Sequence, residues 1–171
     1  ARRMRAGKNV TPRSSLGRLL DAGACSLGLR WRHRFGADAA MTLEATAAEC
    51  RNTVEPLTLP FAAGQFDYRP LVRDLVRRKQ NGEGVDSLAL AFHLALADGF
   101  AQAIEQLAGA EQLDRVVLSG GCFLNRLLTD ALRERLAGSG LQTYSHTLLP
   151  PGDGGLALGQ AWVAARRPAG Q

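Results

Sequence analysis

Apolar residues recur at helical spacing through the first two thirds of the chain. Leucines and alanines fall three or four positions apart in several segments, which predicts amphipathic helices with one buried face. The predicted helices cover residues 14–29, 38–51, 69–80 and 85–107. In the longest of them, Gly99 is the position at which we expect a kink or an interruption. Pro56, Pro60 and Gly64 interrupt the segment 52–68, which predicts an extended or hairpin connection.

The pattern changes in the last third of the chain, where short strand-like runs alternate with helical periodicity. Residues 115–119 and 141–144 have the composition of strands, and helices are predicted over 123–136 and 153–165. Strand, helix, strand and helix with short connections imply a parallel pair of strands with a right-handed crossover. From the residues alone, the fold class is therefore a helix-rich α/β domain.

Composition narrows the class of protein. A chain of 171 residues with 46% apolar content can build one domain with a sizeable core. No unbroken apolar run approaches the roughly 20 residues of a membrane span, and the basic N-terminus lacks the apolar stretch of a secretory signal. Cys25, Cys50 and Cys122 form no CxxC pair, which suits buried thiols in a reducing compartment. We therefore expect a cytoplasmic protein with no membrane partner.

The net charge of +5 comes from arginines in small groups with acidic or apolar neighbours. A basic protein can bind nucleic acid, but an aromatic content of 6% leaves few rings to stack on bases. We expect most arginines to form solvated faces that attract an anionic substrate or an acidic partner, and we rank nucleic-acid binding last.

Two glycine-rich segments are the candidate chemistry. Ser119, Gly120 and Gly121 follow a predicted strand and precede a predicted helix. Glycine lets a ligand approach the backbone, and free N–H groups at a helix start favour an anion or a polar base edge. A glycine pair after a strand is also a common plain turn. The second segment is 150–155, where Asp153 stands at a helix start and spacing alone favours an N-cap role.

Four ordered motifs resemble the C-terminal part of the HypF family, the carbamoyltransferases of nickel–iron hydrogenase maturation. They are SSLGRLLDA (14–22), AAMTLE (39–44), SGGCFLNRLL (119–128) and PPGDGGLALGQA (150–161). The region is more distantly similar to tRNA threonylcarbamoyltransferases and to antibiotic O-carbamoyltransferases. The resemblance implies the second lobe of an actin-like (sugar kinase/Hsp70) nucleotide-binding fold with a helical insertion. Because that lobe usually has a larger sheet, we expect one or two further strands within 52–68.

The resemblance also implies a nucleotide site. Residues 119–121 would pass under the base and ribose of ATP or carbamoyl-adenylate, and Asn125 would hydrogen-bond to the nucleotide through its amide. Asp21 would hold the ribose hydroxyls. The plainer interpretations are a helix cap for Asn125 and, for Asp21, a solvated residue or a partner of Arg18. Glu44 matches a family motif position, and its role stays open.

Asp153 resembles the single carboxylate that this superfamily contributes to a divalent metal, iron or zinc. The other ligands are a histidine pair of the first lobe, a set that leaves open coordination positions. His33, His93 and His146 do not replace that pair, because none is spaced i,i+4 with another. We expect His93 to be a satisfied core or surface residue, while His146 is a candidate for lining the cleft. Cys122 is interpreted as a packing residue.

The resemblance implies part of a carbamoyltransferase. The family makes carbamoyl-adenylate from carbamoyl phosphate and ATP in a YrdC-like domain, and transfers the carbamoyl group to the C-terminal cysteine of HypE. Residues 14–166, between an irregular lead-in (1–13) and a tail (167–171), would supply the adenosine-binding half and one metal ligand. The N-terminal domains of the enzyme would be its partners, so the chain alone is expected to be inactive. The alternatives are a lobe acting on a small-molecule hydroxyl or on tRNA, or a non-catalytic structural fragment.

Overall fold

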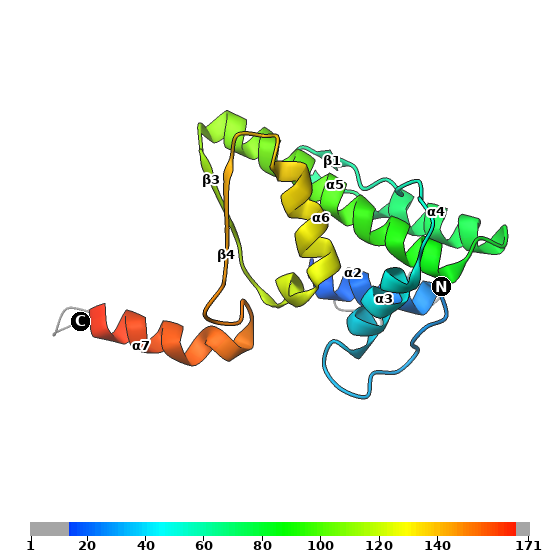
Figure 1. The fold of residues 1–171 in the computed structure, drawn as a ribbon, viewed down its shortest axis with the longest axis horizontal. Helices are drawn as coiled ribbons and strands as arrows, with labels where there is room; N and C mark the ends of the chain where they lie inside the picture. Colours follow the sequence, from blue (N-terminus) through cyan, green and yellow to red (C-terminus); the bar gives the residue numbers. More distant parts are fainter. Residues whose placement is uncertain (1–13, 167–171) are drawn as a thin grey trace, which may run out of the picture.

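The computed structural model describes residues 14–166, so the predicted lead-in and tail lie outside the described residues. The fold is helix-rich with few strands, and a packed group of helices stands beside a two-stranded sheet and a projecting last helix (Figure 1). The elements in chain order are α2 (Leu16–Ser26), α3 (Asp38–Glu49), β1 (Phe61–Ala62), β2 (Gln65–Phe66), α4 (Tyr68–Gln80), α5 (Val85–Glu111), β3 (Arg115–Leu118), the 3₁₀ turn η1 (Gly121–Leu124), α6 (Arg126–Leu136), β4 (Gln142–Ser145), the 3₁₀ turn η2 (Asp153–Gly155) and α7 (Leu156–Arg166).

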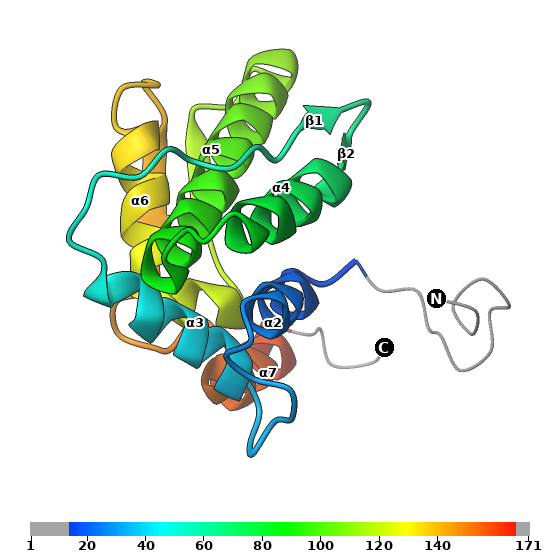
Figure 2. The ribbon, with the colours of Figure 1, turned by 90° about the vertical axis from the view of Figure 1, so that its right-hand side faces the viewer.

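Helix α5 forms the centre of the packed group. Helices α2, α3, α4 and α6 all contact it, as Figure 2 shows along the bundle. Alanine and leucine occupy nearly every face of α5, and a helix that is apolar all round needs partners all round. By length and composition α5 is apolar enough to cross a membrane, although its apolar residues do not form one unbroken run. Most of its apolar window is buried in the bundle, which is the position of a core helix in a globular protein.

Helix α5 runs without a break through Gly99, so the predicted interruption there is wrong. A Cβ at this position would lie 2.9 Å from the carbonyl oxygen of Leu59 and 3.1 Å from its Cβ. The glycine therefore lets an extended segment lie directly on the helix, where the Leu57 N–H donates to the carbonyl of Ala91 at 3.4 Å. The residue that suggested a break in the sequence is a packing site in the structure.

The segment 52–68 does contain strands, but they do not enlarge the sheet as predicted. Strands β1 and β2 form a separate antiparallel hairpin in which Phe61 pairs with Phe66. The ring of Phe66 packs edge-on against Phe100 of α5, with centroids 5.2 Å apart. This aromatic contact holds the hairpin on the helical bundle. Within residues 14–166, the other sheet consists of β3 and β4 alone.

Strands β3 and β4 pair in parallel, as the strand, helix, strand order predicts. Their register runs from Arg115 opposite Gln142 to Leu118 opposite Ser145. Leu118 is the only residue of the two strands that is fully buried. Helix α6 connects the strands and packs on α5, whereas α7 buries none of its residues (Figure 1). The sheet is thus attached to the bundle on one side and open on the other.

Candidate functional site

The two glycine-rich segments meet in the structure. The N–H of Gly120 donates to the carbonyl of Pro151 at 2.8 Å. Gly120 has φ +107°, a conformation that residues with a side chain rarely adopt. A Cβ on Gly152 would lie 3.1 Å from the Cα of Gly121, so the loops approach within van der Waals contact only because this side chain is absent. Residues 31 positions apart in the sequence therefore form one surface.

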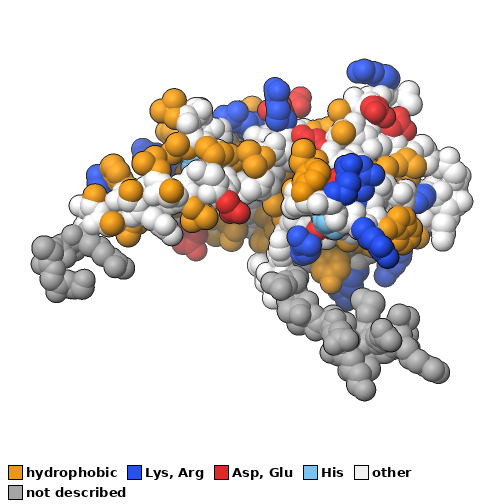
Figure 3. All heavy atoms as spheres, turned by 90° about the horizontal axis from the view of Figure 1, so that it is seen from below, with side chains coloured by type: hydrophobic (Ala, Val, Ile, Leu, Met, Phe, Trp, Pro, Cys, Tyr) orange, Lys and Arg blue, Asp and Glu red, His pale blue; other side chains and the backbone are white. Residues whose placement is uncertain are grey.

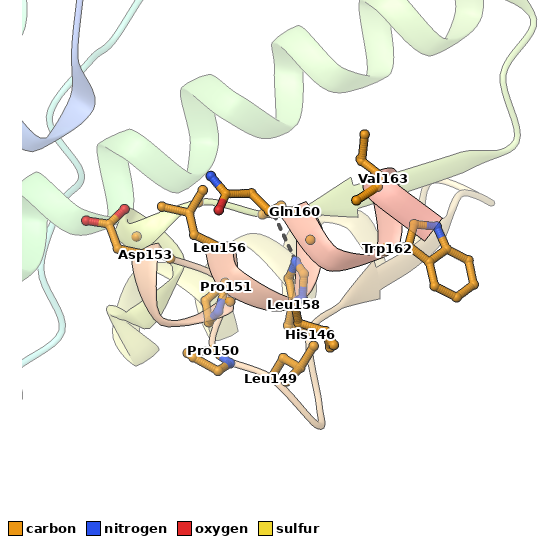
Figure 4. A pocket seen from close by; sticks show the side chains of 17 residues that line it. His146, Leu149, Pro150, Pro151, Asp153, Leu156, Leu158, Gln160, Trp162 and Val163 are labelled. Atoms are coloured by element: carbon orange, nitrogen blue, oxygen red, sulfur yellow. Dashed lines mark hydrogen bonds between the residues drawn. The ribbon is translucent and has the colours of Figure 1, made fainter. Parts of the chain in front are cut away.

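This surface is the floor of a hollow of 1220 Å³ (Figure 4). Its floor includes Ser119, Gly120 and Gly121, and Asp153 lies at its edge. Apolar side chains of the following loop and of α7 form the opposite wall; they include Leu149, Leu156, Leu158, Trp162 and Val163. The hollow combines bare backbone, an apolar wall and a few polar groups, which is the usual composition of a small-molecule site.

His146 joins the ends of the two parallel strands. Its Nε2 lies 2.9 Å from the Oγ of Ser119, a contact drawn in Figure 4. Ser119 follows β3 and His146 follows β4, and the carboxyl ends of parallel strands meet at the same edge of a sheet, where ligands bind in open α/β folds. His146, the candidate for lining the cleft, is one of the residues that line this hollow.

Asn125 lies beneath the hollow, with only 7% of its surface exposed. Its Oδ1 accepts from the N–H of Leu128 at 2.9 Å, which makes Asn125 the N-cap of α6. Its Nδ2 lies 3.0 Å from Nε2 of His93. Because of this cap, α6 begins at Arg126, and the helix predicted over 123–136 is divided into the turn η1 and α6.

Glu44 provides a second cap for the same helix. Its Oε1 accepts from the N–H of Arg126 at 2.7 Å and from the N–H of Leu127 at 3.3 Å. A carboxylate at a helix N-terminus is also favoured by the helix dipole. The first three N–H groups of α6 are thus taken by Glu44 and Asn125, so the prediction that they are free for a ligand is wrong. Sequence reasoning could not assign Glu44, because its partners are 82 residues away.

Asp21 lies on α2, beside Cys122, which follows the glycine pair, and it is not one of the residues that line the hollow. Its Oδ2 is 3.0 Å from Nη1 of Arg18, and its Oδ1 is 3.8 Å from Nε2 of His33. Oδ2 is shielded from solvent, and apart from this ion pair with Arg18 it has no hydrogen-bond partner within residues 14–166. The structure therefore shows the pairing with Arg18 that the plainer interpretation of Asp21 predicted.

Cys122 follows the glycine pair in η1 and lies beside Asp21. Burial raises the pKa of the Cys122 thiol, and the negative charge of Asp21 acts in the same direction, while a backbone hydrogen bond from Gly17 opposes them. A thiol with a raised pKa is poorly ionised near neutral pH and is a poor nucleophile. The environment is that of the packing residue predicted from the sequence.

Asp153 is exposed and stands at the first position of η2, with Gly152 as the N-cap. Its side chain does not cap that turn, so the simple N-cap interpretation is not observed. Across the described part of the chain, no three histidine, cysteine, aspartate or glutamate side chains gather in one place. These residues therefore do not hold a metal by themselves, and Asp153 offers one carboxylate only.

Comparison with known proteins places these features in a family. The family model described as the second subdomain of the Kae1-like domain of carbamoyltransferases matches residues 1–160. A carbamoyltransferase HypF homolog of Cupriavidus necator is 37% identical over 170 residues, covering 94% of this chain and 42% of the relative. The carbamoyltransferase HypF of Rhodobacter capsulatus is 41% identical over 162 residues, which cover 94% of this chain and 21% of the relative.

Two solved structures share the fold. The crystal structure of T. kodakarensis HypF has a TM-score of 0.85 at 30% identity, covering 95% of this chain and 21% of that one. Full-length HypF in a phosphate- and nucleotide-bound form has a TM-score of 0.85 at 29% identity, and the match covers 95% of this chain and 22% of that one. The chain thus spans less than half the length of each of these relatives.

Proposed function

The chain belongs to the HypF carbamoyltransferase family, and from this premise we propose that it supplies the adenosine-binding half of a carbamoyl-transfer site. We take the helix-rich fold as the second lobe of an actin-like nucleotide-binding domain. The chain covers 42% and 21% of the length of these relatives, so we assign the other half of the transfer site to the parts of the relatives that it does not cover. The related full-length HypF was solved with bound phosphate and nucleotide, which supports nucleotide as the ligand class.

The observation that carries this proposal is the contact between the two glycine loops. Because Gly120 and Gly121 have no side chains, the planar face of a purine can rest on their backbone. The apolar wall formed by Leu156 and its neighbours in α7 can cover the opposite face. The carboxylate of Asp21, which is paired with Arg18 in the free chain, is proposed to accept from a ribose hydroxyl. Each of these groups interacts with the adenosine part of the ligand.

Asn125 belongs to the proposed site as the residue that ends the glycine loop. Both ends of its amide are already bonded, to Leu128 and to His93. Because the side chain is buried, a direct hydrogen bond to the nucleotide could use only the second N–H of Nδ2 or the second lone pair of Oδ1. We propose that the main role of Asn125 is to hold the glycine loop in the position that binds the nucleotide.

The proposed reaction moves a carbamoyl group from carbamoyl-adenylate, made from carbamoyl phosphate and ATP, to the C-terminal cysteine of a HypE-like protein. In this reaction the chain holds the adenylate, which is the leaving group. Asp153 is proposed as one ligand of a divalent metal, with the remaining ligands from another part of the longer protein. The acceptor site and the ATP-dependent step are also assigned to those other parts, in the cytoplasm. Carbamoyl transfer by this polypeptide alone would contradict the half-site proposal.

The test is calorimetric titration of the purified chain with ATP and with adenosine. Gly121→Leu places a side chain in open space at the floor of the hollow, since a Cβ there meets no atom within 4 Å. Gly138→Leu is the matched control, because a Cβ there is equally unobstructed and Gly138 lies outside the hollow. We expect Gly121→Leu to weaken binding by about tenfold or more, the effect of losing roughly 1.4 kcal/mol of contact. The control should bind like the unmodified chain.

Two outcomes would overturn the proposal. One is a chain that circular dichroism shows to be folded but that binds neither ligand, even when the first lobe of a relative is added in trans. The other is equal binding by the Gly121→Leu variant and the control. The first outcome would favour a structural fragment that has the fold without the nucleotide site.

A further inference from the structure

His93 is a fully buried polar residue at the centre of α5, and both of its ring nitrogens are engaged. Nδ1 lies 2.8 Å from the carbonyl oxygen of Ala89. A carbonyl can only accept, so Nδ1 carries the proton and Nε2 is left as an acceptor. The Nδ2 group of Asn125 donates to this Nε2 at 3.0 Å. The geometry thus fixes His93 as the neutral Nδ1–H tautomer.

The same series of hydrogen bonds fixes the orientation of the Asn125 amide. Oδ1 of Asn125 accepts from the N–H of Leu128, so the opposite end of the amide must be the donor that faces His93. A flipped amide would place two donors toward Leu128 and an oxygen toward the lone pair of Nε2. The hydroxyl of Thr129 further donates to the carbonyl of Asn125 at 2.8 Å. Each of these polar atoms thus has at least one partner.

The junction lies directly behind the glycine loop, residues 119–125. Asn125 is both the last residue of that loop and the first fixed point of α6. The loop begins at the end of β3, where it contacts Pro151. Its path is therefore held at one end by the sheet and at the other by the bond to His93. A leucine in place of His93 would avoid the cost of burying an imidazole, but it would leave the Asn125 donor without a partner.

We propose that His93 is a positioning residue for the glycine loop, acting through the side-chain amide of Asn125. His93 touches no ligand, because it is fully buried and both ring nitrogens are occupied. It sets the backbone surface on which the nucleotide rests. The ligand-binding part of this inference rests on the proposed function, whereas the loop-positioning part concerns the protein alone.

The experiment compares two amide substitutions that each reproduce one nitrogen of the imidazole. His93→Gln can place an acceptor near the former Nε2 and keep the bond to Asn125. His93→Asn can keep the bond to Ala89 but is too short to reach Asn125. The control is Asp98→Asn, which weakens the ion pair between Asp98 and Arg135 that also joins α5 to α6, away from the loop.

Two readouts are measured in each variant. Amide hydrogen exchange of Leu128 and Gly120 reports the loop without ligand, and titration with ATP reports the site, at a matched folded fraction. We expect His93→Asn to speed exchange of Leu128 and to weaken ATP binding, each by about tenfold, the effect of one lost buried hydrogen bond. His93→Gln should stay within about threefold of the unmodified chain in both readouts, as should Asp98→Asn.

If His93→Asn fails to fold, Asn125→Asp replaces it. This change keeps the cap oxygen and the volume but replaces the donor with an oxygen that faces Nε2 of His93. We then expect faster exchange of Gly120 and about tenfold weaker ATP binding. If the unmodified chain binds no ATP even with the first lobe of a relative added in trans, while Leu128 or Gly120 exchange in the variant changes as expected, the proposed function is refuted and the positioning role is supported. Unchanged exchange and unchanged ATP affinity in His93→Asn, or in Asn125→Asp where that variant replaces it, would overturn the positioning role.

Discussion

The helical bundle and the projecting helix α7, which we call the arm, contain the same kinds of apolar residues, but these residues are buried in the bundle and exposed in the arm. Leu88 and Leu96 in α5 are completely buried, whereas Leu158 and Trp162 in α7 are 54% and 59% exposed. Figure 3 shows apolar side chains along the arm, with no bundle element covering them on this face. An apolar periodicity therefore predicts a helix in both places, but burial depends on whether a partner element is present.

The nucleotide site we propose lies on the boundary between these two parts. Its floor is held by residues of the bundle, through Glu44 and His93, while its apolar wall belongs to the exposed α7. Hydrogen bonds from the bundle hold the floor in place, whereas the residues of the wall stay exposed within residues 14–166. This division is consistent with a half-site.

Many arginines pair with acids; the pairs include Arg18–Asp21, Arg34–Asp38, Arg69–Asp67, Arg77–Asp74, Arg78–Glu83 and Arg135–Asp98 on the helical bundle, and Arg115–Asp114 beside the sheet. Each of these arginines therefore has a negative charge beside it, and nucleic-acid binding stays the interpretation that we rank last.

The largest expected contrast between the two parts comes from matched leucine truncations. Leu96→Ala should lower the free energy of unfolding by about 2–5 kcal/mol, because it opens a cavity in the core. Leu158→Ala in α7 should change it by less than about 0.5 kcal/mol, since the side chain is exposed. Urea denaturation followed by circular dichroism measures both. Equal losses would show that α7 is packed in solution, for example by self-association.

A smaller contrast, of opposite sign, is expected for two glycines in helices. A Cβ at Gly23 in α2 would lie 3.0 Å from the ring of Phe92, so Gly23→Ala should destabilise the fold by about 1–3 kcal/mol through overpacking. A Cβ at Gly159 in α7 meets no atom within 4 Å, so Gly159→Ala should raise helix stability by up to about 1 kcal/mol.

Thermal melts of both variants, with the helical signal at 222 nm, test this second comparison. A stabilising Gly23→Ala would mean that α2 and α5 are not in close contact at Phe92. A destabilising Gly159→Ala would mean that α7 is covered by another surface in solution.

The smallest effect is a pH dependence specific to the bundle. Burial lowers the pKa of His93, although its bond to Ala89 and the facing carboxylate of Glu44 oppose the shift. Below the ordinary histidine pKa of about 6.5, the unfolded chain binds a proton that the folded chain does not. The free energy of unfolding should therefore be highest above about pH 6.5 and decline as the pH falls below it.

Denaturation at a series of pH values between about 7.5 and 5.5 measures this slope. His93→Gln removes the titrating group and should flatten the profile over the same range. An unchanged slope in that variant would assign the pH dependence to other groups and weaken the case for a neutral, buried His93.

The sequence alone determined most of the elements and the main candidate loops. Helical periodicity located α2 to α5, the order of the last segments predicted the parallel pair β3–β4, and the glycine pair at Gly120 and Gly121 indicated the site. These features are encoded within a few residues of each other, by side-chain periodicity and backbone freedom, so local reasoning was sufficient.

Only the tertiary structure decided how distant residues are joined. It placed Glu44 and His93 behind Asn125, which moved the start of α6 to Arg126, and it kept the β1–β2 hairpin on α5 instead of in the larger sheet. It also left α7 uncovered, although its sequence is as apolar as that of a buried helix. Hydrogen-bond pairing and burial depend on partners far away in the chain, and these partners are not encoded in any local pattern.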